Sequence, residues 1–284
     1  MTRADKIKNF MLSPGVSILA GVLGLALWSL TAAFSYQAAA ISVLTVALIT
    51  REIKARTLYR GPNFTIIGLF IMLQAAVGAT FTGCLIALTG AIALTGIISC
   101  FARPDKTRLL FLIYMVLGLG AMVCRSFAIL APVMLAPLIL IRAFSPQGLM
   151  AAILGFITPA IILCGFGVYD AMSLQAIYTS PFTGHIGLTT IAAVSAAALS
   201  VIATFFRSYG YPAKMRAGNL AILGLTLMAA AAPLANAADA GDYLPLVNLC
   251  TAYNIAHFSA YKKFGWIAAV VVYVAAGVFI FLPK

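Results

Sequence analysis

The chain has 284 residues, of which 63% are hydrophobic and only 8% are charged. A soluble domain carries about 25% charged residues, so this composition excludes a water-soluble globular protein and indicates a surface that faces lipid. The net charge of +12 would suggest nucleic-acid binding in a soluble protein. Here the basic residues lie in short clusters between continuous apolar runs, which favours helical membrane spans and predicts no nucleic-acid partner.

The apolar runs predict an all-α polytopic membrane protein, a single integral membrane domain over residues 1–284 without a soluble domain. A span needs about 20 apolar residues. We expect about 11 transmembrane helices, and at least 9, since the second, fifth, sixth and tenth runs are short or polar. The runs cover residues 14–34, 37–50, 63–80, 83–101, 109–124, 126–141, 148–168, 186–205, 218–236, 244–260 and 264–282.

The positions of the basic residues test this count. With the N-terminus inside, 16 of the 18 lysines and arginines fall on the inner side, and only Arg125 and Lys284 fall outside. A wrong span anywhere would scatter the basic clusters over both sides, so the agreement supports the predicted number and orientation. The expected location is the bacterial inner (cytoplasmic) membrane, crossed many times.

Arg125 interrupts an otherwise apolar stretch, residues 109–141. A single helix over this stretch would be about 50 Å long, against a hydrocarbon core of about 30 Å. The sequence therefore predicts a hairpin of two short helices with Arg125 and Ser126 at its outer tip. Pro132 and Pro137 are expected to kink or shorten the second arm. The arginine then either faces a watery site or extends to lipid phosphates.

Two stretches carry a resemblance to known families. Residues 112–166, with "LIYMVLGLGAMVCRSFAILAPVMLAPLILIRAFSPQGLM" at their start, resemble a module of the GT-C superfamily of membrane glycosyltransferases. In that module a Gly-rich short helix, a basic residue at a turn and a Pro/Leu-rich short helix follow one another. "YRGPNFTIIGLF" (59–70) and "RAFSPQGLMAAILGFITP" (142–159) resemble an uncharacterised family of multipass inner-membrane proteins from Bacteroidota, known only as a domain of unknown function.

The resemblance implies a GT-C-like bundle that binds or transfers a polyprenyl-phosphate-linked sugar at the outer, periplasmic face. One departure leaves enzymatic activity open. GT-C enzymes carry an acidic residue on a sizeable first outer loop, whereas the first outer loop here is about "SYQ" (35–37). This departure also argues against a bound metal, and no cofactor is expected.

Candidate site residues gather in the predicted outer loops. The longest such loop (169–187) holds Tyr169, Asp170, Tyr178 and His185, and a later loop holds Asp239 and Asp242. A phosphate-linked sugar needs a cation for its phosphate and a carboxylate or histidine as general base. We therefore expect Asp170 and His185 as catalytic residues, and Arg125, Ser126, Tyr169, Tyr178, Asp239 and Asp242 as substrate-binding residues. The alternative is that outer loops are simply polar.

A polar stripe marks the tenth run, where Asn248, Tyr253, Asn254, His257 and Tyr261 recur at spacings that place them on one helix face. Such a stripe either bonds to neighbouring helices or lines a cavity, and packing is the favoured interpretation. Besides the GT-C-like function, two alternatives stay open. One is a non-catalytic scaffold subunit of an envelope assembly, with a membrane protein partner. The other is a small-solute transporter. In each case membrane lipids are the surrounding partners.

Overall fold

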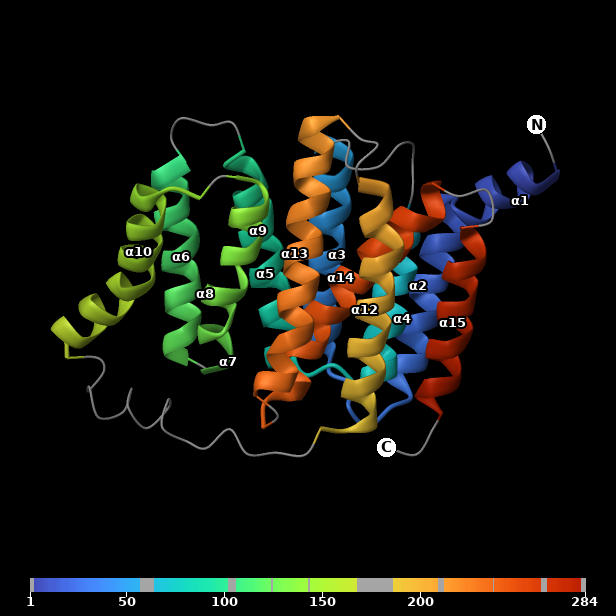
Figure 1. Cartoon of the computed structure of the whole chain (residues 1–284). Helices are drawn as coiled ribbons and strands as arrows, with labels where there is room; N and C mark the ends of the chain where they lie inside the picture. The colour runs from blue at the N-terminus through green and yellow to red at the C-terminus, as the bar shows by residue number, and fades with distance from the viewer. Residues whose placement is uncertain are drawn as a thin grey trace.

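A computed structural model of the chain describes residues 3–56, 64–101, 106–123, 125–142, 144–167, 186–208, 212–236, 238–261 and 265–281. Within these ranges the side chains of a few residues, Arg125 among them, lie outside the description. The described residues form fourteen α-helices and no β-strand (Figure 1). The predicted all-α class is therefore confirmed.

The helices are α1 (Arg3–Met11), α2 (Pro14–Ser29), α3 (Tyr36–Arg56), α4 (Thr65–Val77), α5 (Phe81–Ser99), α6 (Lys106–Val123), α7 (Arg125–Ala128), α8 (Leu130–Val133), α9 (Leu135–Leu140), α10 (Pro146–Gly165), α12 (Leu188–Ser208), α13 (Ala213–Ala235), α14 (Ala240–Tyr261) and α15 (Trp266–Ile280). Each predicted apolar run coincides with one helix or, for 126–141, with three short ones. Successive long helices run in opposite directions between two ends of the molecule (Figure 1).

Four helices contain a segment long and apolar enough to cross a membrane. These segments are Phe81–Ser99, Pro146–Gly165, Leu188–Phe205 and Met215–Ala235. They indicate a membrane protein, as the composition predicted. The remaining apolar helices are shorter, and α4, with 13 residues, extends only about 20 Å at 1.5 Å per residue.

The helix ends differ from the predicted span borders where basic residues begin. The second run was expected to end at residue 50, but α3 continues to Arg56 and includes Arg51 and Lys54. Lys106 and Arg108, expected in a loop, begin α6. The reason is physical, because apolarity defines how much of a helix lies in lipid, whereas backbone hydrogen bonds and propensity decide where the helix ends.

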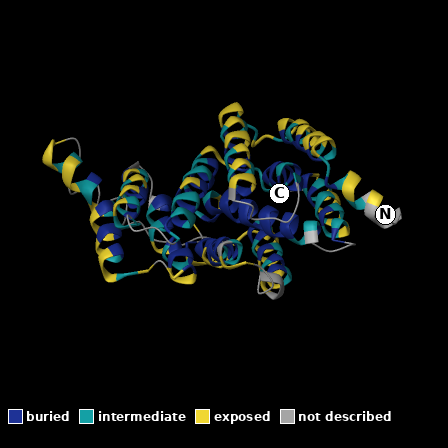
Figure 2. Ribbon diagram, turned by 90° about the horizontal axis from the view of Figure 1, so that it is seen from above, coloured by how far each residue is buried: buried dark blue, intermediate teal, exposed yellow. Residues whose placement is uncertain are grey.

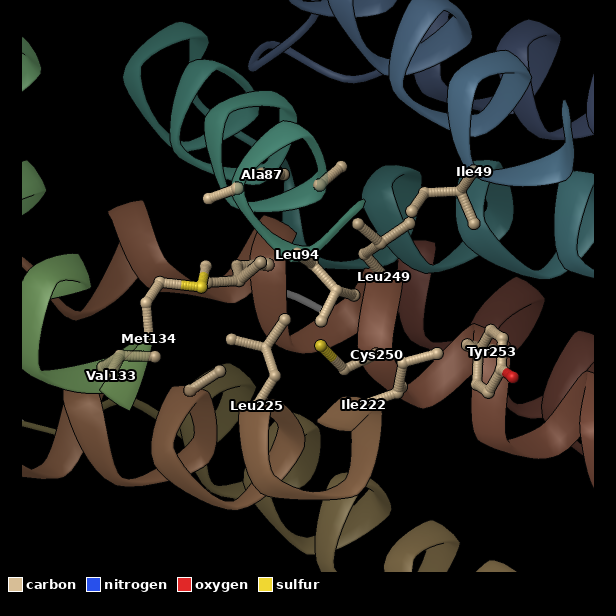
Figure 3. Close-up of a cluster of buried hydrophobic side chains, with 14 of the residues drawn as sticks. Ile49, Ala87, Leu94, Val133, Met134, Ile222, Leu225, Leu249, Cys250 and Tyr253 are labelled. Atoms are coloured by element: carbon tan, nitrogen blue, oxygen red, sulfur yellow. The ribbon is translucent and has the colours of Figure 1, made fainter. Parts of the chain in front are cut away.

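Helix α14 is the centre of the bundle. It packs against α4, α5, α12, α13 and α15, and nearly every side chain from Tyr243 to His257 is buried. The apolar core around it draws side chains from most of the described helices, and Figure 3 shows Ile49 of α3, Leu94 of α5 and Leu225 of α13 around Leu249 and Cys250 of α14. Cys84, Cys100 and Cys250 are buried free thiols, whereas Cys164 is half-buried.

Helix α10 lies at the edge of the molecule and packs chiefly against α6 (Figure 1). Two glycines permit this contact. A methyl group added at Gly118 of α6 would overlap the carbonyl oxygen of Phe156, and one added at Gly155 of α10 would overlap the carbonyl oxygen of Phe111. The two backbones therefore touch directly, while the opposite side of α10 is exposed (Figure 2).

The second arm of the predicted hairpin is broken into α7, α8 and α9. A proline lacks the amide donor and its ring clashes with the carbonyl four residues earlier. Pro132 and Pro137 therefore disturb the backbone at Ala128 and Val133, which are the last residues of α7 and α8. The sequence predicted this shortening correctly.

The N-terminal helix α1 is attached to the far end of α14. The Lys8 ammonium donates a hydrogen bond to the carbonyl oxygen of Ala260, with an Nζ–O distance of 2.7 Å. The last carbonyls of a helix have no intrahelical partner and carry partial negative charge. Lys8 thus supplies the donor and the positive charge that this helix end requires.

Candidate functional site

A cluster of polar side chains lies at the end of the molecule where α5, α7 and α14 begin. We call it the Asp242 cluster, and its members are Thr80, Ser126, Asn236, Asp239, Asp242 and Tyr243. These residues come from three segments that are far apart in the sequence. Among the described residues the cluster brings together two carboxylates, those of Asp239 and Asp242.

The Asp242 carboxylate accepts two hydroxyl hydrogen bonds. Thr80 Oγ1 donates to Oδ1 at 2.9 Å, and Ser126 Oγ donates to Oδ2 at 3.3 Å. Each carboxylate oxygen can accept a further hydrogen bond, because an ionised carboxylate has about four lone-pair sites. Asp242 is therefore held in a fixed orientation, and its carboxylate can still accept a hydrogen bond from a hydroxyl group of a ligand.

Asn236 connects the second carboxylate to the cluster. Its Nδ2 donates to Asp239 Oδ2 at 2.9 Å and to the hydroxyl oxygen of Tyr243 at 3.3 Å. Asn236 and Tyr243 are each 1% exposed, whereas Asp239 and Asp242 are partly exposed. The Asn236 amide and the Tyr243 phenol thus lie buried beneath the cluster, and the carboxylates of Asp239 and Asp242 above them are accessible from the surface.

Local backbone features hold the first turn of α14 against α5. Gly78 closes the turn after α4 with φ +65°, a left-handed conformation that favours glycine. Thr80 then caps α5, since its Oγ1 accepts a hydrogen bond from the Gly83 amide at 3.0 Å. An added Cβ at Gly83 would lie 2.7 Å from Pro245 Cγ, so only glycine permits this close approach.

Burial raises the pKa of the Asp242 carboxyl above its ordinary value, because desolvation disfavours the charged form. The hydroxyls of Thr80 and Ser126 act in the opposite direction, and the nearby Asp239 charge adds to the increase. Asp242 lies in the first turn of α14, outside the four candidate spans and outside the predicted run 244–260. A carboxylate with a raised pKa is a stronger base than a fully exposed one.

The predicted site residues fall into two groups. Ser126, Asp239 and Asp242 are brought together in one cluster, although Ser126 and Asp242 are 116 residues apart in the chain. Arg125 begins α7 directly beside Ser126, but its side chain lies outside the description. Tyr169, Asp170, Tyr178 and His185 fall in 168–185, outside the described residues.

Sequence reasoning missed Thr80 and Asn236. Thr80 carries a local signal, because a threonine after Gly78 and before an apolar run is a typical helix N-cap. Its second role, as donor to Asp242, has no local signal. Asn236 stands in an Ala-rich stretch, "PLANAADA", and nothing in that stretch indicates that its amide joins Asp239 to Tyr243.

The polar stripe of α14 bonds to neighbouring helices. Asn248 Nδ2 donates to Gln74 Oε1 of α4 at 3.1 Å. Asn254 Nδ2 donates to Thr226 Oγ1 of α13 at 3.1 Å and to Ser200 Oγ of α12 at 3.3 Å. The predicted packing role is confirmed for these two residues.

Two aromatic residues complete the described part of the stripe. The Tyr253 hydroxyl donates to Asn219 Oδ1 of α13 at 2.5 Å. The His257 ring stacks on the Tyr253 ring, with centroids 6.3 Å apart and planes inclined by 11°. The side chain of Tyr261 lies outside the description. Asn248, Asn254 and Tyr253 therefore cross-link α14 to three neighbours.

Within the part of the chain that the structure describes, no group of three or more His, Cys, Asp and Glu side chains is placed to hold a metal ion. Comparisons with family models, with curated proteins and with solved structures find no match to the chain. The chemistry of the Asp242 cluster is therefore the basis for the functional argument.

Proposed function

We propose that the chain crosses the bacterial inner membrane eleven times, with its basic end in the cytoplasm and the Asp242 cluster at the periplasmic face. The alternating helix directions support this topology (Figure 1). So does the charge pattern, since positive residues remain on the cytoplasmic side of inner-membrane proteins. The start of α7 and the start of α14, which meet in the cluster, would both lie at the outer face.

We further propose that the Asp242 cluster binds a polyprenyl-phosphate-linked sugar, as expected of a GT-C-like membrane protein. The observation that carries this proposal is the Ser126–Asp242 hydrogen bond, which brings the hairpin tip next to an outer-loop carboxylate. Carboxylates and hydroxyls are suited to sugar hydroxyl groups, and Arg125, the neighbour of Ser126, would bind the phosphate.

If the sugar is transferred, the chemistry assigns two tasks. A base takes the proton of the acceptor hydroxyl while the oxygen of that hydroxyl forms a bond to the anomeric carbon of the sugar. The C–O bond between the anomeric carbon and the polyprenyl phosphate breaks, and the phosphate leaves with its electrons. Asp170 and His185 are the proposed bases. Arg125 would stabilise the negative charge of the leaving phosphate.

A binding assay tests the proposal with the full chain in detergent and a short-chain polyprenyl-phosphate-linked hexose as the probe. We expect Asp242→Asn and Arg125→Gln to weaken binding about tenfold or more, since each removes a charge-assisted hydrogen bond. Ser195→Ala is the matched control, because Ser195 Oγ is exposed and donates to Ile191 of its own helix. If the probe does not bind, or if both variants bind it as the unchanged protein does, the proposal fails.

A second candidate function, a non-catalytic membrane scaffold, has one observation in its favour. Helix α10 presents an exposed apolar side that includes Ile153, Leu154, Ile157 and Ile161, while it packs chiefly on α6. Another membrane subunit could cover this side. The scaffold predicts that Ile157→Trp releases a co-purifying membrane protein without changing the binding of the sugar probe, and sugar binding lost in Asp242→Asn would favour the first candidate.

A further inference from the structure

A second polar feature lies at the opposite, basic end of the molecule. There the ends of α5 and α9 and the start of α13 line a half-open cavity of about 420 Å³. This volume lies within the range of about 300–1,000 Å³ that is usual for small-molecule sites. Phe101, Leu140, Ile141 and Leu220 supply an apolar wall, and two arginines, Arg142 and Arg216, supply the charge. None of the described residues that line this cavity is acidic.

Arg142 occupies a backbone position that disfavours an arginine. It follows the end of α9, its φ angle is +56°, and its amide donates to the Ile139 carbonyl oxygen at 3.0 Å. The left-handed conformation after a helix is normally taken by glycine, and other residues pay a cost of about 1–2 kcal/mol there. Residues with strained backbone angles are found more often at ligand-binding and catalytic sites than elsewhere in proteins.

Arg216 is also placed against local preference. It lies in the first turn of α13 and is half-buried, and its amide donates to the Pro212 carbonyl oxygen at 2.9 Å. The start of a helix carries partial positive charge, so a cation there is unfavourable unless an anion lies nearby. One arginine just after α9 and one in the first turn of α13 are thus both in locally unfavourable positions and both line one pocket, which makes this pocket positively charged.

The apolar wall indicates which anion the cavity would take. A free phosphate needs only the cations, whereas a lipid offers an anionic headgroup to the arginines and an acyl chain to Phe101, Leu140 and Leu220. We propose that this cavity is a binding site for an anionic phospholipid of the cytoplasmic leaflet, whose phosphate pairs with Arg142 and Arg216. The site is separate from the Asp242 cluster and does not depend on sugar binding, while its assignment to the cytoplasmic leaflet rests on the proposed topology.

Native mass spectrometry of the full chain in detergent tests the site, with phosphatidylglycerol as the probe and phosphatidylcholine for comparison. We expect one phosphatidylglycerol to bind in preference to phosphatidylcholine. Arg142→Gly and Arg216→Gln should each weaken that binding about tenfold or more, through loss of a charge-assisted contact. Arg142→Gly should also leave the melting temperature unchanged or raise it, because glycine relieves the left-handed backbone.

Arg51→Gln is the matched control, since Arg51 is an exposed arginine of α3 at the same end and does not line the cavity. It should bind phosphatidylglycerol as the unchanged protein does. Equal weakening in Arg51→Gln, or unweakened binding in both cavity variants, would overturn the proposal. Inorganic phosphate is the third arm. If it displaces phosphatidylglycerol at millimolar concentration, the site takes free phosphate and the assignment to a lipid is wrong.

Discussion

In α14 and α10, polarity and burial are combined in the opposite way from the helices of a soluble protein. Helix α10 is apolar except for Gln147 and Thr158, yet only 28% of its candidate span is buried. Helix α14 carries Asn248, Asn254 and His257, all of which are buried, and it is not among the four candidate spans. In water the polar helix would face the solvent and the apolar helix would form the core.

The reason for the difference is the solvent. Lipid tails are as apolar as leucine, so an apolar helix gains little by leaving them, and α10 can remain at the edge. A polar helix in lipid must find hydrogen-bond partners inside the protein, so α14 takes the central position. Close backbone contact holds α10 to α6, whereas hydrogen bonds connect α14 to α4, α12 and α13.

The largest effect is expected at the edge pair. Gly155→Ala places a methyl group against the Phe111 carbonyl oxygen and forces α10 away from α6. We expect the free energy of unfolding to fall by about 1–3 kcal/mol, the usual cost of overpacking. Denaturation by SDS in mixed micelles measures the change. Gly165→Ala is the control on the same helix, because an added Cβ there meets nothing within 4 Å, and an equal loss in both variants would contradict the glycine contact.

A smaller effect is expected in the central helix. Asn254→Leu removes two hydrogen bonds and leaves the hydroxyls of Ser200 and Thr226 without their amide donor. Hydrogen bonds between membrane helices contribute about 0.6 kcal/mol each and at most about 1.7 kcal/mol, so we expect a loss of about 1–2 kcal/mol. The same denaturation assay measures it, with Ser195→Ala as the control on α12. A variant as stable as the unchanged protein would mean that these two hydrogen bonds do not stabilise the bundle.

The Tyr253→Phe variant distinguishes the contribution of the tyrosine hydroxyl to stability from that of the ring. The variant loses the hydrogen bond to Asn219 but keeps the aromatic stack with His257. The expected loss in unfolding free energy is about 0.6 kcal/mol, the average for one such bond. The double variant Tyr253→Phe with Asn219→Leu should be no less stable than Asn219→Leu alone, and a further loss in the double variant would argue against this pairing.

The smallest effect concerns pH at the start of α14. Since the pKa of the Asp242 carboxyl is raised above its ordinary value, the folded protein binds a proton there more readily than the unfolded chain does. The resulting stabilisation is fully present below the unfolded pKa and is lost as pH rises through the folded pKa. Unfolding measured between pH 4 and pH 7 should therefore show greater stability at the acidic end. Asp242→Asn should reduce this slope, whereas a slope unchanged in the variant would assign the effect to other groups.

The sequence predicted the helical class and the broken hairpin arm because both depend on local properties, apolar runs and proline positions. It also predicted that Asn248 and Asn254 bond to neighbouring helices, although not that they do so on different sides of α14: six residues at about 100° each place them about 120° apart, and they bond to α4 and to α12 and α13 respectively. The sequence could not predict the hydrogen-bond partners of these two residues. Gln74, Ser200 and Thr226 are separated from them by long stretches of chain, and a single sequence does not show which helices lie side by side.

The candidate site shows the same limit. Ser126, Asp239 and Asp242 were expected on one side because each lies between apolar runs, and the structure adds that they form one cluster. Thr80 was missed because a threonine cap is a local feature of α5, and only the packing of α5 against α14 turns it into a partner of Asp242. The inner cavity was missed for a different reason. Arg142 and Arg216 both satisfied the charge rule and needed no further explanation.

The bond between Lys8 and the Ala260 carbonyl oxygen has a consequence for the order of assembly, because 252 positions separate the two residues. A ribosome adds about 5–20 residues per second, so roughly 13–50 s pass between the synthesis of one partner and that of the other. During that time Lys8 lacks its acceptor, because the carbonyl group of Ala260 has not yet been made. Helix α1 is thus attached only after α14 has been made, and protection of α1 from proteolysis would report that α14 has been inserted.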